Sequence, residues 1–246
     1  LVINSGCNGK FVSVLDLNIR GKSFSYKYKL LPVLSNQIKP SQKMNSLINN
    51  LKEPHKVHLD QIIGKSSLDL YRRGNFGGSW DNVICDAIIQ ERDTEISLSP
   101  GFRWGTTILP GQEITIDDVY SQTSMNYPEV YRTEMSGEMI KDLLEDVCDN
   151  IFNPDPFFQQ GGDMVRVGGL SYTCKPKNSI GNRISNLELI SSGEKIDPSR
   201  KYVVGGWGSV NPEVKGPPIF KLLEKYITNE NLIKPKYSNT VKVVGV

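Results

Sequence analysis

The chain has 246 residues, with 29 basic and 27 acidic side chains and a formal net charge of +2. A hydrophobic share of 38% and a charged share of 23% are typical of a globular protein and exclude an intrinsically disordered one. No apolar run approaches the ~20 residues that span a bilayer, and the balanced charge argues against a general nucleic-acid binder. The length predicts one full domain and part of a second.

The first 35 residues predict a β-hairpin. Every second residue over 11–19 shares one largely apolar face, residues 20–22 form a tight turn, and a second strand follows over 23–31. A hairpin alone is marginal in water, and the chain begins without an initiator Met or a signal sequence. We therefore interpret residues 1–35 as the trailing strands of a truncated N-terminal domain, and the chain as a fragment. These strands are expected to pack on the second domain, swap onto a neighbour or fray.

Residues 36–63 predict a linker that contains a short helix. Ser41 is suited to cap this helix, the apolar residues from Met44 to Leu51 follow helical spacing, and Pro54 ends it.

Residues 64–246 predict a domain of mixed strands and helices. Ser79 is suited to cap a helix over 80–91, and a second helix begins at Ser136. Because strands and helices do not alternate regularly, the pattern predicts an α+β fold. A third helix is predicted over residues 218–228. Strands are predicted over residues 95–99, 165–174, 184–190, 202–206 and 241–244.

The four cysteines, Cys7, Cys85, Cys148 and Cys174, are scattered along the chain without a CxxC pair. This spacing excludes a zinc ribbon and is too sparse for a disulfide scaffold of the small secreted kind. It leaves one or two disulfides open in an oxidising compartment. Cys85 lies on the apolar side of a predicted helix and is interpreted as a core thiol.

Residues of the usual catalytic kinds are few. His55 and His58 are the only histidines, whereas hydrolytic metal sites need several histidine and carboxylate ligands. No GxSxG nucleophile motif occurs, and we interpret Asp117 and Asp118 as capping residues at the start of a helix. The sequence therefore predicts neither a catalytic metal nor a catalytic residue in this chain.

Three glycine-rich loops stand out instead. Residues 72–78 combine two arginines with glycines ahead of a predicted helix, residues 101–105 place Arg103 between two aromatic side chains, and residues 205–208 follow a strand. Glycines let the backbone approach a ligand, a helix N-terminus favours an anion, and an arginine between aromatic rings suits an oxyanion. Each loop alone is more often a surface turn. Together they predict a binding cleft for an anion.

Several motifs resemble the C-terminal domain of the 5′-nucleotidase family, in order and spacing from about residue 64 to 228. Residues 135–140 are similar to the family's M-T-G-x-x-[IL] helix start, and residues 99–103 lie where the family has a G-G-G-I-R loop. Two departures are Val167 before a glycine pair, and residues 205–212 in place of a G-G-D-G-Y-like loop. Aromatic residues that clamp a base are not found at the expected places. The other matching stretches are residues 75–87, 111–119, 170–172 and 197–202.

This resemblance implies an α+β fold with a mixed sheet and packed helices, like the C-terminal domain of 5′-nucleotidases. It also implies that residues 1–35 are the residual β-hairpin of a truncated metallophosphoesterase domain, residues 36–63 a linker, and residues 64–246 the substrate-binding domain.

Within this superfamily, residues 72–81 and 100–107 resemble the SoxB family of sulfur-oxidation hydrolases, and residues 1–33 are similar to the stretch after its metal-binding histidines. The resemblance implies a periplasmic thiosulfohydrolase with two metal ions, usually manganese, in its N-terminal domain. Such an enzyme releases sulfate from a cysteine-S-thiosulfonate on the C-terminal arm of a SoxYZ carrier protein. For this chain the resemblance implies no cofactor of its own, no activity alone, and neither a nucleic-acid nor a membrane partner.

The same resemblance implies roles for residues of the glycine-rich loops. Arg103 would contact the sulfonate, with Asn75 and Trp104 beside it, and Tyr127 and Trp207 would line the path of the carrier arm. Two alternatives stay open: the C-terminal domain of a 5′-nucleotidase or cyclic-nucleotide phosphodiesterase, and a non-catalytic domain that binds an anionic peptide or sugar. The candidate substrate-binding residues are Arg73, Asn75, Phe102, Arg103, Trp104, Tyr127 and Trp207.

Overall fold

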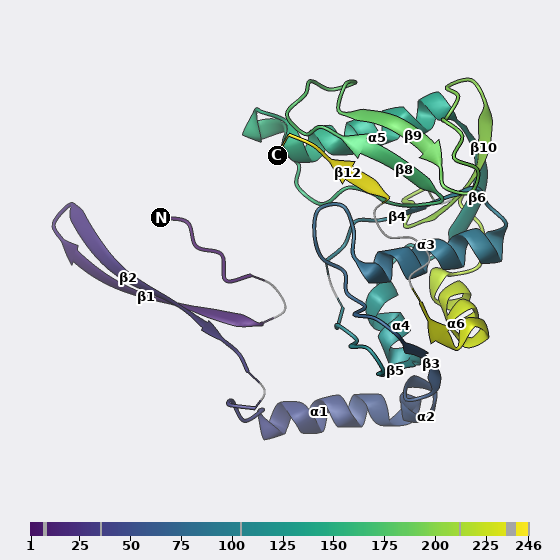
Figure 1. Ribbon diagram of the computed structural model, residues 1–246. Coiled ribbons are helices and arrows are strands. Elements are labelled where there is room, and N and C mark those ends of the chain that lie inside the picture. The colour runs from purple at the N-terminus through teal and green to yellow at the C-terminus, as the bar shows by residue number, and fades with distance from the viewer. Residues whose placement is uncertain (7–8, 35, 104, 212, 235–239, 246) are drawn as a thin grey trace. The chain divides into compact units, whose positions relative to one another are not determined.

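A computed structural model describes the chain except for residues 7–8, 35, 104, 212, 235–239 and 246. The chain divides into two compact units, Leu1–Lys56 and Val57–Val246 (Figure 1). Within the described residues, none of the helices combines the length and the apolar character that a membrane crossing requires.

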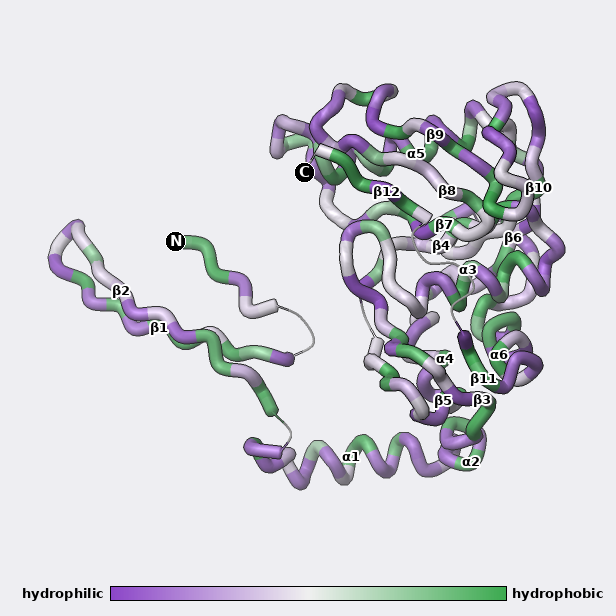
Figure 2. The backbone as a smooth tube through the Cα atoms, viewed as in Figure 1, coloured by the Kyte–Doolittle hydropathy of each residue, from purple (hydrophilic) through white to green (hydrophobic). Residues whose placement is uncertain are grey.

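The first unit contains the predicted hairpin and the predicted short helix. Strand β1 (Phe11–Arg20) pairs antiparallel with β2 (Ser23–Pro32), and Gly21 has the positive φ of 61° that the tight turn needs. Helix α1 (Gln42–Lys52) is capped by Ser41, whose Oγ accepts a hydrogen bond from the Met44 amide. Hydrophobic residues recur along both strands and α1 (Figure 2), yet none of the described side chains of this unit is buried. The unit therefore has secondary structure but no core of its own.

The described residues of the second unit form three small sheets rather than one. Its four-stranded sheet has the order β6-β10-β4-β7, in which β10 runs parallel to β4 and antiparallel to β6. This mixture of parallel and antiparallel pairing confirms the α+β fold with mixed sheets. The strands of this sheet are β6 (Val130–Ser136), β10 (Lys201–Trp207), β4 (Ile96–Ser99) and β7 (Arg166–Gly168). The two three-stranded sheets have the orders β11-β3-β5, from Leu232–Ile233, Ile62–Ser66 and Glu113–Thr115, and β12-β8-β9, from Val241–Val243, Leu170–Cys174 and Ile184–Leu189.

The helices of this unit divide its core into two hydrophobic clusters. One cluster lies around α3 and α6, which pack side by side, with α4 beside them; the other lies between α5 and strands β7 to β10 (Figure 1). The helices are α3 (Ser79–Arg92), α4 (Ile116–Thr123), α5 (Gly137–Phe152) and α6 (Ile219–Glu230); the short helices η1 (Glu53–His55), α2 (Lys56–Leu59) and η2 (Pro156–Phe158) lie in the connections.

Two local predictions were wrong in detail, for physical reasons. The N-cap of α3 is Gly78 and not Ser79, because the Asp81 carboxylate accepts the Gly78 amide at 2.8 Å and does the capping itself. The single strand predicted over 165–174 is broken at Gly169 into β7 and β8, which belong to different sheets. Gly169 has a φ of 70°, and a side chain there would collide with the backbone oxygen of Glu95.

The capping predictions for Ser136 and Asp118 are confirmed. The Ser136 Oγ accepts from the Met139 amide at 3.2 Å at the start of α5. Asp118 bonds the amide of Thr115 at 2.9 Å at the start of α4. Cys85 is fully buried on α3, as a core thiol.

Candidate functional site

The two arginine-bearing loops meet at the surface of the second unit. The Arg103 Nε donates to both carboxylate oxygens of Asp163, at 2.8 and 2.7 Å, and its Nη2 donates to the Asn75 side chain. Arg73 Nη1 donates to the Arg103 carbonyl at 3.1 Å. The Arg103 side chain is 46% exposed, so its guanidinium is oriented by protein groups while one side of it faces solvent. The structure thus brings three predicted residues, Arg73, Asn75 and Arg103, together.

Asp163 and the residues after it form hydrogen bonds to both arginine-bearing loops. The Met164 amide donates to the Asn75 carbonyl at 2.9 Å, and Arg166 Nη2 donates to the Gly74 carbonyl at 3.0 Å. Arg166 also pairs with Asp163, at 3.2 Å between Nη2 and Oδ2. The carboxylate of Asp163 is therefore shared between a surface arginine and a buried one.

Arg72, the neighbour of Arg73, points into the interior and braces the second loop. Its Nε pairs with Asp81 Oδ1 at 2.8 Å, and its Nη2 donates to the Pro100 carbonyl at 2.9 Å. Its guanidinium also lies 5.7 Å from the centre of the Phe102 ring, a cation–π distance. The predicted residue Phe102 is thus partly buried against a structural arginine.

Asp81 supplies the buried negative charge that faces the buried arginines. Its second oxygen lies 3.4 Å from Arg166 Nε, so one carboxylate faces two buried guanidinium groups. Burial raises the pKa of Asp81, although Arg72 and Arg166 both oppose that shift. Burial also lowers the pKa of Arg166, whose Nη1 has no hydrogen-bond partner among the described residues. With Arg103 and Asp163 included, three arginines meet two aspartates, which leaves an excess of positive charge.

The third glycine-rich loop, residues 205–208, packs closely against the second loop at Gly208. Gly208 has a φ of 76°, and a side chain at this position would collide with Pro100 and approach Met125. Its amide donates to the Tyr127 carbonyl at 3.2 Å, which places Tyr127, an exposed residue, next to the turn that follows β10. The described parts of the three glycine-rich loops therefore adjoin one another, and the cleft expected between them stays a prediction.

One of the predicted residues contributes almost no surface. Trp207 is 3% exposed and its Nε1 donates to the Ser99 Oγ at 2.8 Å, so it packs in the core and presents almost no surface to a ligand. This corrects the prediction that it lines a path for a substrate arm. Trp104 lies outside the described residues.

Sequence reasoning missed the three residues that organise the site, namely Asp81, Asp163 and Arg166. A signal existed only for Asp81, an acidic residue in the first turn of a helix behind an arginine pair. Asp163 and Arg166 follow a glycine pair without a motif, and only the tertiary fold reveals their partners.

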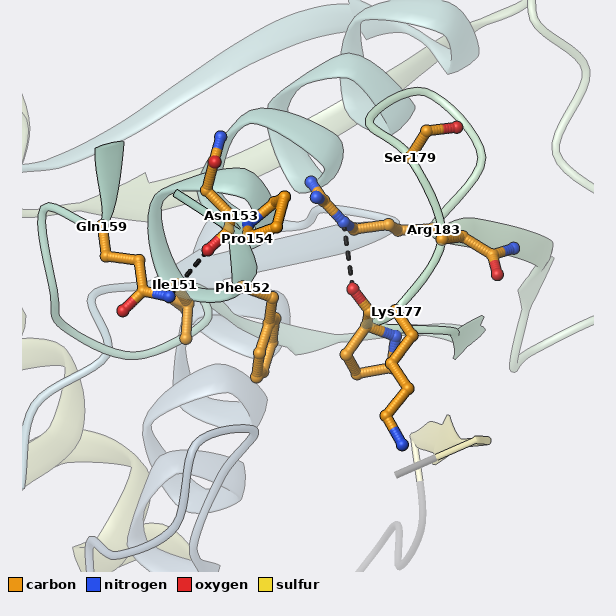
Figure 3. A pocket seen from close by; sticks show the side chains of 10 residues that line it. Ile151, Phe152, Asn153, Pro154, Gln159, Lys177, Ser179 and Arg183 are labelled. Atoms are coloured by element: carbon orange, nitrogen blue, oxygen red, sulfur yellow. Dashed lines mark hydrogen bonds between the residues drawn. The ribbon is translucent and has the colours of Figure 1, made fainter. Parts of the chain in front are cut away.

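A cavity of about 660 Å³ lies next to this site, at the end of α5 and the loop after β8 (Figure 3). Phe152 lines it, and the Phe152 ring stacks on Phe76 of the first loop with centroids 6.0 Å apart. Arg183 also lines the cavity, where its Nε donates to the Pro176 carbonyl at 3.2 Å (Figure 3). Of the sequence-predicted site residues that the structure describes, none lines this cavity.

The described residues do not supply a metal centre. Among them, no group of three or more His, Cys, Asp or Glu side chains is arranged to hold an ion. His58 Nε2 instead bonds the Tyr120 hydroxyl at 3.2 Å. The manganese ions that the sequence resemblance implies have no ligand set in this part of the chain, and we assign the chain no step that runs through them. What the site can do chemically is bind and orient an anion.

The fold and the site define a class of protein. The sequence matches the family described as 5′-nucleotidase, C-terminal domain, over residues 62–208, which is more than half of the chain, and the chain therefore belongs to this family. No curated protein sequence matches the chain.

Among solved structures, the chain is similar to the sulfate thiohydrolase SoxB of Thermus thermophilus, solved in complex with glycerol. The two share 33% identity with a TM-score of 0.88, over 97% of this chain and 45% of that one. A 5′-nucleotidase precursor from Thermus thermophilus has 18% identity and a TM-score of 0.75, over 97% of this chain and 50% of that one. The NAD nucleotidase of Haemophilus influenzae has 17% identity and a TM-score of 0.61, over 87% and 46%. The last two show the fold alone, and the chain spans half or less of the length of each protein.

Proposed function

We propose that this chain is the substrate-binding C-terminal part of a SoxB-like thiosulfohydrolase, with the sulfonate of the substrate held at Arg103. The observation that carries the proposal is the half-exposed Arg103 guanidinium, fixed by Asp163 and Asn75 where the glycine-rich loops adjoin. The 33% identity to SoxB over 97% of the chain supports the choice of this subfamily. On this proposal residues 64–246 are the substrate-binding domain and residues 1–35 the trailing strands of a metallophosphoesterase domain.

In the proposed reaction, this chain binds the substrate, and the remainder of the whole enzyme supplies the attacking group. Water or hydroxide forms a bond to the sulfonate sulfur, and the bond from that sulfur to the adjoining sulfane sulfur breaks. Sulfate leaves, and the sulfane sulfur stays on the carrier cysteine as a persulfide, which takes up a proton from the water. Donors from Arg103, Arg73 and the Asn75 amide would hold the sulfonate oxygens in place, since charged donors bind such oxygens most strongly. The attacking group and the two metal ions would be held outside this chain. The partner would be a SoxYZ-like carrier with a cysteine on its C-terminal arm, and the compartment the periplasm.

Binding of a synthetic carrier-arm peptide tests this proposal. The peptide is glycine-rich and carries a cysteine-S-thiosulfonate; the same peptide with free cysteine and AMP serve as comparison ligands in calorimetry. We expect the modified peptide to bind best, and Arg103→Ala to weaken it roughly 10-fold or more, because a hydrogen bond to a charged group contributes about 1.5–3 kcal/mol.

Arg200 offers a matched control. Its side chain is 47% exposed and paired with Glu95 at 2.9 Å, so it resembles Arg103 in exposure and pairing but lies in the turn before β10. Arg200→Ala should leave peptide binding unchanged. Equal loss in both variants, or tighter binding of AMP than of the modified peptide, would contradict the proposal, and the second outcome would favour a nucleotidase.

A further inference from the structure

Two cysteines that are far apart in the sequence meet in the core of the second unit. Cys148 lies in the last turns of α5 and Cys174 is the last residue of β8, and their sulfur atoms are 3.6 Å apart. Both side chains are fully buried. A disulfide bond is about 2.05 Å long, so the sulfurs need to approach by roughly 1.5 Å for a bond to form.

The surroundings hold helix and strand in this register. Glu145, one turn before Cys148, is buried and accepts the backbone amides of Gly181, Arg183 and Ile184. Arg183 in turn pairs with Asp149, the residue after Cys148. The loop that connects β8 to β9 is therefore tied to α5 on both sides of the cysteine pair, and the two sulfurs face each other on rigid elements.

The two thiols are chemically unequal. The hydrogen bond between the two sulfurs lowers the pKa of Cys174, while the same bond and burial raise the pKa of Cys148. A thiolate is the nucleophile in thiol–disulfide exchange. Cys85 differs: it sits alone on α3, where burial raises its pKa to about 12. Cys7 lies outside the described residues.

We propose that Cys148 and Cys174 are a cross-link site that is oxidised to a disulfide when the chain folds in an oxidising compartment. One of the two cysteines, as its thiolate, attacks a disulfide oxidant and displaces one of its thiolates. The other cysteine then loses its proton and attacks the sulfur of the first, which displaces the other half of the oxidant. Two cysteine thiols lose two electrons and two protons, and the oxidant's disulfide becomes two thiols. Because both sulfurs are buried, the bond forms before α5 closes over β8, and afterwards it resists soluble reductants.

The cross-link would fix two walls of the 660 Å³ cavity. Phe152 follows Cys148 by one helical turn, and Pro176 follows Cys174 by two residues; both line that cavity. Phe152 also carries the stacking contact to Phe76 of the first loop. The bond would therefore hold the edge of the anion site as well as the core. This inference does not depend on which anion the site binds.

Oxidative refolding tests the inference directly. The reduced, unfolded chain is refolded in a buffer of oxidised and reduced glutathione, free thiols are alkylated in denaturant, and peptides are mapped by mass spectrometry. We expect a linked pair of peptides that contains Cys148 and Cys174, lower in mass by two hydrogen atoms, with Cys85 alkylated. Melting of the oxidised chain should occur about 5–10 °C above that of the reduced chain.

Cysteine variants separate this pair from the others. Cys85→Ser is the matched control, since its sulfur is also buried, and it should retain the linked peptides. Cys148→Ser should lose them and lose the difference in melting temperature. If Cys148→Ser does not fold, the peptide map of the unaltered chain decides. Full alkylation of all four cysteines in the natively folded chain, or linkage of either cysteine to Cys7, would overturn the inference.

Discussion

Arg72 and Arg73 are neighbours in the sequence and have opposite surroundings in the structure. Arg72 is buried and bonds Asp81 and two backbone carbonyls, whereas Arg73 is partly exposed and reaches across to the loop of Arg103. A buried guanidinium needs a charged partner, because the loss of hydration otherwise costs several kcal/mol. An exposed one contributes little to stability. Two adjacent residues of one loop thus have different roles: Arg72 stabilises the loop from the interior, and Arg73 contributes to the exposed surface of the candidate site.

The same division separates Arg166 from Arg103. Both bond Asp163, but Arg166 is buried beneath the loops and Arg103 is at the surface. The buried arginines stabilise the loops, and the exposed arginines are available to a ligand. The predictions that follow test this division with stability and binding as separate readouts.

The largest effect is expected for Asp81→Asn. The substitution keeps the shape of the side chain but leaves Arg72 and Arg166 buried without the charge between them. We expect a loss of about 3–5 kcal/mol in the free energy of unfolding, measured by urea titration. Asp146→Asn, at an exposed position of α5, is the control and should change stability by less than about 0.5 kcal/mol. A small effect at Asp81 would show that the buried charges are compensated in another way.

An intermediate effect is expected for Arg72→Met, with Arg73→Met as its matched control. Loss of Arg72 leaves the carbonyls of Gln122 and Pro100 without their donor, and we expect about 2–4 kcal/mol of destabilisation. Arg73→Met should stay within about 0.5 kcal/mol of the unaltered chain and weaken binding of the thiosulfonate peptide instead. Equal stability losses in both variants would remove the distinction between the two arginines.

The smallest effect on stability is expected for Trp207→Phe. The ring volume is largely kept, and the hydrogen bond from Nε1 to the Ser99 Oγ is lost. A typical hydrogen bond of this kind contributes about 0.5–1.5 kcal/mol, so thermal unfolding should occur a few degrees lower. Peptide binding should not change, because Trp207 is in the core. Weaker peptide binding with unchanged stability would show instead that Trp207 contributes to the binding surface.

The sequence was most informative where structure depends on neighbours along the chain. Gly21 predicted the hairpin turn, and Ser41 and Ser136 predicted helix starts, because turns and caps are settled within three or four residues. The glycine-rich loops likewise predicted that Arg73, Asn75 and Arg103 lie together, whereas the binding of an anion there stays a prediction. Gly169 shows the limit, since the strand breaks where Gly169 lies against the backbone of Glu95, the residue before β4, which is more than seventy residues earlier in the chain.

The parts of the site that could not be predicted depend on contacts that only the folded chain makes. Whether Arg72 or Arg73 turns inward follows from the position of Asp81, and Asp163 gains its role only because the segment before β7 lies under both loops. The resemblance and its place in a glycine-rich loop put Trp207 on the path of the carrier arm, whereas the strand that it ends is an inner strand of the four-stranded sheet and its side chain is buried.

The shared carboxylate of Asp163 has a consequence for how such a site works over repeated cycles. A ligand that pairs with Arg103 gains only the difference between its own bond and the one that Asp163 already supplies. When the ligand leaves, the Arg103 guanidinium does not have to regain a full hydration shell, because it stays paired with the Asp163 carboxylate. If the proposed function holds, we therefore expect a site of this kind to bind sulfate weakly and to release it quickly.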